Sequence, residues 1–301
     1  MSTQTLTTAT ADAPPPRHPG PPRPGLPATT RKWLVRGLIA VILVIEIYPI
    51  FWILSGSFKT QEQFLNEPLW SLPTSFGFDN FVTAMTTGNL GTNLLNSLMV
   101  TVPSLLLILA LGAGAAFALE VMLWPGRTKV LLFVVAGIMV PAQIILLPLF
   151  TIYYRLGLTD SLWPLIITYV GHGLPLTVFL LATYFRAVPR ELFEACALDG
   201  GGTLRCFLSV GLPMIRNGLF TVALLMFFSV WNDLLIALTF NTRSDLATVQ
   251  VGLLNFNGEY GSVAYGPLFA AISTTILGTL VVYLSINQQV MKGVAAGSLK
   301  G

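Results

Sequence analysis

The chain has 301 residues, of which 54% are hydrophobic and only 10% are charged, and its mean hydropathy is +0.74. Soluble domains usually carry about 25% charged residues, so this composition excludes an ordinary soluble enzyme and predicts a polytopic membrane protein. The net charge is only +3. No basic cluster is interleaved with aromatic residues, which argues against binding to nucleic acid.

Residues 1–30 are rich in Pro, Thr, Ala and Gly and contain no apolar run. This composition predicts a disordered tail. The tail lacks the apolar core of a secretory signal, and its basic residues suit a cytoplasmic location. Residues 31–301 are predicted to form the membrane domain.

Apolar stretches long enough to cross a bilayer of about 30 Å recur along this domain. They predict an all-α fold with six transmembrane helices, at about 34–54, 97–119, 130–153, 162–185, 218–240 and 265–286. The small residues 112–116 in the second span are suited to close helix packing. Internal prolines, including Pro141, are expected to kink the third span.

Polar residues inside the spans are candidates for a translocation path, because ionisable groups at membrane depth are costly. Glu46 lies in the first span, and Trp231, Asn232 and Asp233 lie in the fifth. Glu46 is either a functional carboxylate or a residue that faces a polar bundle interior. His172 in the fourth span fits a hydrogen-bonded bundle residue better than a ligand.

A polar segment at 189–213 separates the fourth span from the fifth and is predicted to form two short helices around a hinge. Pro189 suits the first turn of the first helix, and the glycines at 200–202 would end it. Thr203 is expected to cap the second helix and Pro213 to end it. On these features alone, an ordinary connecting loop is an equally good interpretation.

The two cysteines of the chain, Cys196 and Cys206, both lie in the 189–213 segment. A reducing compartment would keep them as thiols. Two cysteines without a nearby histidine make a poor metal site, so no metal is expected.

Six spans place both termini on the same side of the membrane. If that side is the cytoplasm, only Lys59, Arg155 and Arg243 of the sixteen Lys and Arg residues lie outside. This asymmetry fits the positive-inside rule and predicts cytoplasmic N- and C-termini. The 189–213 segment is then cytoplasmic too.

The 189–213 segment resembles the cytoplasmic coupling loop in the membrane subunits of bacterial binding-protein-dependent ABC importers. That family's pattern is Glu-Ala-Ala, three residues, Gly, nine residues, Ile-x-Leu-Pro. This chain has Glu194-Ala195-Cys196, then Gly200, then Val210-Gly211-Leu212-Pro213. The departures are Cys196 for Ala and Val210 for Ile. Asp199-Gly200 and Trp231-Asn232-Asp233 resemble the carbohydrate branch of the family, which includes the second maltose permease subunit.

The resemblance implies a type I ABC importer permease fold and a role in the import of a mono- or oligosaccharide across a bacterial plasma membrane. It implies a heterodimer with a second permease subunit, two ATPase subunits and an extracytoplasmic sugar-binding protein. Pro141 would lie near the translocation path, beside the polar candidates already named. The residues that would couple to the ATPase are Glu194, Ala195, Cys196, Asp199, Gly200, Leu212 and Pro213.

The sequence contains no phosphate-binding loop and no catalytic pattern. We therefore expect a transport subunit that is not itself an enzyme and holds no cofactor, with ATP and magnesium on the partner ATPase. One alternative is an ABC importer permease for another solute. Another is a proton-coupled secondary transporter that uses Glu46 and Asp233.

Overall fold

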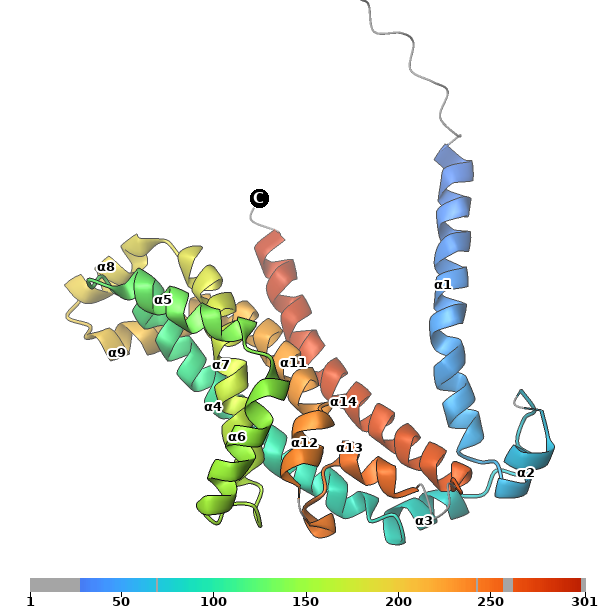
Figure 1. Ribbon diagram of the computed structural model, residues 1–301. Coiled ribbons are helices and arrows are strands. Elements are labelled where there is room, and N and C mark those ends of the chain that lie inside the picture. The colour runs from blue at the N-terminus through green and yellow to red at the C-terminus, as the bar shows by residue number, and fades with distance from the viewer. Residues whose placement is uncertain (1–27, 69, 242, 257–261, 299–301) are drawn as a thin grey trace, which may run out of the picture. The chain divides into compact units, whose positions relative to one another are not determined.

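A computed structural model describes residues 28–68, 70–241, 243–256 and 262–298. All the regular elements within these residues are helices (Figure 1), so the predicted all-α class is confirmed. The chain divides into two compact units, residues 1–49 and 50–301, which are described separately.

The first unit contains most of α1 (Ala28–Gly56), whose last residues belong to the second unit. Because α1 begins at Ala28, the predicted disordered tail overlaps the helix at residues 28–30, and its earlier part lies outside the described residues. The side chain of Glu46 is exposed within its own unit.

The core of the second unit is the pair formed by α4 (Leu90–Glu120) and α7 (Trp163–Arg186), which share the most extensive helix contact of the described chain. The backbones approach so closely at Gly112 that an added Cβ atom would overlap the side chain of Thr177. Close approach of this kind is what small residues permit in membrane helices.

The predicted third span is two helices rather than one. α5 (Arg127–Ala136) continues into a 3₁₀ turn (Gly137–Met139), and α6 (Ala142–Arg155) follows after a bend of 94°. Pro141 immediately precedes α6 in an extended conformation. The expected kink is therefore present, but it is large enough to divide the span.

The predicted fifth span is also divided. α11 (Arg216–Trp231) ends before three non-helical residues, and α12 (Leu235–Phe240) continues the chain. The last long helix, α14 (Tyr265–Ser298), is unbroken and extends past the predicted end of the sixth span. Four described helices are long and apolar enough to cross a membrane. Two bent pairs, Arg127–Met139 with Ala142–Arg155 and Thr203–Met214 with Arg216–Trp231, bring the total to as many as six if each pair is one span.

Short helices gather at the two ends of the α4–α7 pair (Figure 1). At the beginning of α4 lie α3 (Asp79–Thr86), α13 (Val249–Gly252) and 3₁₀ turns at Ser244–Leu246 and Leu253–Phe256, and α2 (Gln61–Asn66) contacts the start of α14. At the other end lie α8 (Arg190–Leu198), α9 (Thr203–Cys206), a π-helical turn (Phe207–Gly211) and α10 (Leu212–Met214). We call these the outer end and the inner end, after the orientation that the sequence predicts.

Candidate functional site

The first helix of the 189–213 segment is α8, and it ends where the glycines predicted. Its last residue is Leu198, and Gly200 adopts a φ of 76°. This left-handed conformation favours glycine over other residues. Pro189 precedes α8 with an extended backbone instead of lying in its first turn.

The second helix differs from the prediction at both of its ends. Gly202 occupies the cap position of α9, and Thr203 is the first helical residue, without a side-chain capping bond. Pro213 lies within α10, and the chain turns by 76° only after Met214. Proline is tolerated there because the first turn of a helix needs no N–H donor at that position.

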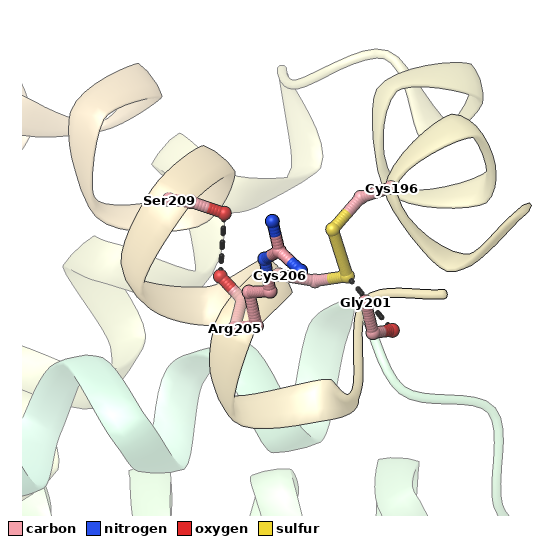
Figure 2. The surroundings of a disulfide bond; sticks show 5 residues. All are labelled: Cys196, Gly201, Arg205, Cys206 and Ser209. Carbon is pink, nitrogen blue, oxygen red and sulfur yellow. Dashed lines mark hydrogen bonds between the residues drawn. A yellow bond between two sulfur atoms is a disulfide. The ribbon is translucent and has the colours of Figure 1, made fainter. Parts of the chain in front are cut away.

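Cys196 and Cys206 form a disulfide (Figure 2), so the expectation of two free thiols is wrong for this structure. The chain reverses at the glycines and returns α9 alongside the last turn of α8. This reversal brings the two Cα atoms to 5.9 Å, which is within the range that a disulfide spans.

Four phenylalanines attach the 189–213 segment to the long helices, and we call them the aromatic cluster. Phe117 near the end of α4 is its centre. The ring centroid of Phe117 lies 5.6 Å from that of Phe185, 5.7 Å from that of Phe193 and 5.2 Å from that of Phe207. Offset and edge-on ring pairs at these distances are favourable. The cluster therefore joins α8 and the π-helical turn directly to α4 and α7.

Most of the coupling residues that the resemblance implies lie on an accessible surface. Glu194, Ala195, Asp199, Gly200 and Pro213 are exposed, whereas Cys196 and Leu212 are half-buried. Within the described residues, no hydrogen bond or ion pair involves the Glu194 side chain.

Large apolar side chains also lie on this surface, and the sequence interpretation did not select them. Leu198 is 89% exposed, Leu204 is 68% exposed and Leu208 is 53% exposed. A run of exposed leucines beside a packed cluster is typical of a surface that another protein covers. We call Leu198, Leu204 and Leu208 the leucine surface.

An ion pair joins the ends of α4 and α7 beside the aromatic cluster. Arg186 donates two hydrogen bonds of 3.0 Å to the carboxylate of Glu120. Arg127 adds a 3.0 Å bond from its guanidinium to the backbone carbonyl of Glu120. The inner ends of both long helices are thus connected by polar contacts as well as by rings.

The break between α11 and α12 carries the predicted polar group, and its three residues point to different places. Trp231 is buried and stacks on Phe227 with the ring centroids 5.6 Å apart. Asp233 accepts hydrogen bonds at Oδ1 from the backbone N–H groups of Ile236 (2.9 Å) and Ala237 (3.2 Å) and from the hydroxyl of Tyr169 (2.9 Å). Asp233 therefore caps the start of α12.

Asp233 also lines a cavity of about 230 Å³, which we call the polar cavity. Its polar lining includes Gln143, Tyr169 and His172. The bend at Pro141 places Gln143 here, since α6 begins directly after that proline. His172 also lines this cavity, but it is exposed, and no hydrogen bond involves its side chain within the described residues, so the expected hydrogen-bonded bundle residue is not found there.

Asn232 lines a second space of about 500 Å³, which we call the long groove. The groove lies among α11, α13 and α14 and combines polar groups with aromatic and aliphatic ones. Its polar lining consists of Asn232, Gln250, Thr275, Thr279 and Tyr283. The structure thus divides the candidate residues of the translocation path. Asn232 lines the long groove, and Asp233 lines the polar cavity. Trp231 is buried, and Glu46 belongs to the other unit.

The outer end is held by hydrogen bonds from side chains to backbone. Asn96 donates to the carbonyl oxygens of Asp245 (2.8 Å) and Ala247 (3.0 Å), and the N–H of Val249 donates to Ser97 Oγ (2.8 Å). On the exposed side of this turn, a hydrogen bond from the Arg243 guanidinium lowers the pKa of the Asp245 carboxyl. Nothing in the sequence pattern pointed to these long-range contacts.

Within the searched part of the chain, no three His, Cys, Asp or Glu side chains come close enough to hold a metal ion. The described residues present an exposed apolar surface at the inner end and two spaces along the bundle.

The chain is similar in sequence to known membrane transport proteins. The family described as binding-protein-dependent transport system inner membrane component matches residues 108–290. The diacetylchitobiose uptake system permease protein NgcG of Streptomyces coelicolor is 35% identical over 264 residues, which cover 87% of each chain. The trehalose/maltose transport system permease protein MalG of Thermococcus litoralis is 29% identical over 90% of this chain and 97% of its own.

A chain from the crystal structure of a bacterial ABC transporter that imports the acidic polysaccharide alginate has the same fold. The TM-score is 0.75 at 20% identity, and the match covers 88% of this chain and 99% of the other. The matched family region includes the 189–213 segment and the break after Trp231. This multi-pass membrane protein therefore belongs to the family of inner membrane components of binding-protein-dependent transport systems.

Proposed function

We propose that this chain is one half of the translocation path of an ATP-driven carbohydrate importer and receives motion from an ATPase at the 189–213 segment. The family membership supports the importer class. Relatives named for the uptake of diacetylchitobiose and of trehalose or maltose support a mono- or oligosaccharide as the transported solute.

The observation that carries the proposal is the position of the leucine surface next to the aromatic cluster. A partner that binds Leu198 and Leu204 holds α8 and α9. Because packed side chains transmit displacement with little compression, movement of α8 reaches Phe117 through Phe193. It then reaches α4 directly and α7 through Phe185.

The proposed coupling residues have distinct tasks in this arrangement. Glu194 and Asp199 present exposed carboxylates to the partner, and Gly200 allows the reversal. Leu212 packs on the core, and Pro213 lies in the first turn of α10. Ala195 is small enough for close approach of the partner.

The remaining partners follow from the same proposal. A second permease subunit would complete the path, and two ATPase subunits would hold ATP and magnesium. A sugar-binding protein would deliver its ligand at the outer end, and the N- and C-termini would be cytoplasmic. The complex of the alginate transporter includes a periplasmic protein bound to an alginate pentasaccharide, which supports a receptor as a partner here.

We place the path along the long groove and the polar cavity. Both spaces combine apolar walls with a few polar groups, as ligand sites in proteins generally do. Asn232 and Asp233 would meet the solute or its water from opposite sides of the same break. Asp233 is already occupied by three donors, which favours a structural carboxylate over a proton relay.

Site-specific photo-cross-linking tests the docking surface. A photoreactive amino acid replaces Leu198 in the full chain, which is co-expressed with the permease and ATPase genes of its operon. We expect a cross-link to the ATPase. The same residue at Trp70, which is 77% exposed at the outer end, is the control and should not yield that product. An ATPase product from Trp70 with none from Leu198 would contradict the proposal.

Uptake into membrane vesicles separates the alternatives. We expect uptake of a labelled oligosaccharide to require the receptor and ATP at the inner face, and to continue after a protonophore collapses the proton gradient. Uptake that is lost when the proton gradient collapses and does not depend on ATP would identify a proton-coupled transporter. Uptake of a solute other than a sugar under the same ATP dependence would change only the substrate class.

A further inference from the structure

The disulfide lies where the proposed docking helix meets its hinge. Cys196 is in the last two turns of α8, and Cys206 is the final residue of α9, so the bond joins the two helices on either side of the glycines. Leu198 and Leu204 lie on the same two helices. The bond therefore connects the two parts of the leucine surface.

We propose that Cys196 and Cys206 form a reversible thiol–disulfide site that sets the stiffness of this hinge and thereby the affinity of the ATPase for the 189–213 segment. The docking half of this inference rests on the proposed function. The chemical half concerns only the cysteines of this chain.

Accessibility determines the order of the chemistry. Cys196 is half-buried, whereas Cys206 is only 5% exposed. A small-molecule disulfide, such as oxidised glutathione, therefore reacts first with the thiolate of Cys196. A mixed disulfide forms and one small thiol leaves. The thiolate of Cys206 then attacks the Cys196 sulfur and expels the second small thiol. The protein loses two protons and two electrons, and the small-molecule disulfide is reduced to two thiols.

The backbone of the hinge is shaped around the two sulfur atoms. A Cβ atom at Gly201 would lie 2.6 Å from the carbonyl oxygen of Cys196, 2.7 Å from Cys196 Sγ and 3.2 Å from Cys206 Sγ. The N–H of Gly201 donates to that same carbonyl at 2.9 Å. Only glycine fits between the cysteines, so a change at the sulfurs acts directly on the hinge backbone.

In the reduced state, the thiol proton of Cys206 has a hydrogen-bond acceptor nearby. Cys206 Sγ lies 3.5 Å from the carbonyl oxygen of Gly201 (Figure 2), so a thiol there donates a weak hydrogen bond. Phe193 and Phe207 still attach both arms to Phe117 in the absence of the disulfide. Reduction therefore frees the hinge between α8 and α9 without detaching the segment.

The consequence is a difference in binding. In the disulfide form Leu198 and Leu204 are held in a fixed relation, so a partner orders fewer groups when it docks. Preorganisation of this kind increases affinity mainly by lowering the cost of ordering. The disulfide form is accordingly the tighter-binding form.

Alkylation of the full chain in membranes tests the chemistry alone. Membranes are equilibrated at a series of ratios of oxidised to reduced glutathione and quenched with N-ethylmaleimide, and labelling of each cysteine is measured by mass spectrometry. We expect Cys196 and Cys206 to lose labelling together as the ratio rises and to regain it with dithiothreitol. In Cys206→Ser, Cys196 should form only a mixed disulfide with glutathione. Full labelling of both wild-type cysteines at every ratio would overturn the inference.

Binding of the purified ATPase to the permease heterodimer in nanodiscs tests the consequence. We expect the dissociation constant of the oxidised complex to be about fivefold lower than that of the reduced complex, the gain from ordering one or two fewer side chains. Cys206→Ser should match the reduced wild type under both conditions. Cys196→Ala should also be insensitive to redox state, whatever its own affinity.

Equal affinity of the oxidised and reduced wild type would overturn the inference while leaving the proposed function intact. Absence of ATPase binding in both forms would instead overturn the proposed function, and the docking half of the inference with it.

Discussion

The short elements at the inner and outer ends of the α4–α7 pair differ in their side-chain contacts with α4, although both ends also contain apolar packing. At the inner end, α8 and the π-helical turn contact the long helices mainly through the rings of Phe193 and Phe207 on Phe117. At the outer end, Asn96 and Ser97 hydrogen-bond to the backbone that precedes and begins α13.

These interactions respond differently to displacement. A hydrogen bond weakens steeply when its angle or length changes, so the outer contacts fix the register of the turn against α4. Ring contacts are less directional and persist through small shifts. Under the proposed function, this difference suits the outer end to a constant geometry and the inner end to contact maintained during motion.

Removal of the centre of the aromatic cluster should have the largest effect. Phe117→Ala deletes a buried ring with three ring neighbours and should cost about 3–5 kcal/mol of stability. ATP hydrolysis by the complex should continue while sugar uptake is lost. Unfolding in detergent and vesicle uptake measure the two effects. Phe117→Leu is the control, since it keeps much of the buried apolar volume. Normal coupling in Phe117→Ala would show that the rings do not transmit motion.

The outer end should respond with a smaller loss of stability. Asn96→Leu leaves the carbonyl oxygens of Asp245 and Ala247 without their donor and should cost about 1–3 kcal/mol. Hydrogen exchange should increase within the Ser244–Leu246 turn and α13. Thr92→Ala, on the exposed side of the same helix, is the matched control. If exchange increased at α8 rather than at the outer turn, the distinction between the two ends would fail.

The hinge should show a residue-specific effect. Gly200→Val forces a β-branched side chain into a φ of 76° and should cost about 1–2 kcal/mol, whereas Gly200→Asn should cost less because asparagine tolerates this conformation. Gly202→Ala, at an ordinary φ of −68° with open space around it, should be nearly neutral. Thermal unfolding of the three variants gives the order, and equal losses would show that the left-handed backbone is not what selects glycine.

The ion pair beside the cluster should matter least. The Arg186 side chain is 64% exposed and that of Glu120 is 16% exposed, and ion pairs that are open to solvent contribute about 0.2–1 kcal/mol. Arg186→Gln should therefore lower the free energy of unfolding by no more than that amount, and the difference should shrink in high salt. A larger loss of stability that high salt does not reduce would show that this ion pair is one of the main contacts that hold the inner end together.

The sequence predicted the presence of membrane-spanning helices and the hinge because both depend on local signals. Long apolar runs report crossings directly, and consecutive glycines report the end of α8. It did not predict that the third and fifth spans divide. A proline such as Pro141 indicates a kink but not its angle, and the 94° bend also depends on how α5 and α6 pack on their neighbours.

The contacts that define the site could not be predicted from local signals. Phe117 and Phe193 belong to different helices, and nothing in the spacing of phenylalanines along the chain relates them. The disulfide was missed for another reason. The expectation was argued from the compartment, whereas the pairing follows from the reversal that brings Cys196 beside Cys206. Polar residues of the spans were recognised, but the division of Asn232 and Asp233 between two spaces required the fold.

The central position of Phe117 limits how this transporter can be re-engineered. A chimera could exchange the 189–213 segment for that of a relative in order to bind a different ATPase subunit. The side chains of the new segment would then pack against the ring of Phe117, which belongs to α4. Such a transplant should succeed only when the residue at 117 is exchanged together with the segment. The functional module of the inner end is thus discontinuous in sequence.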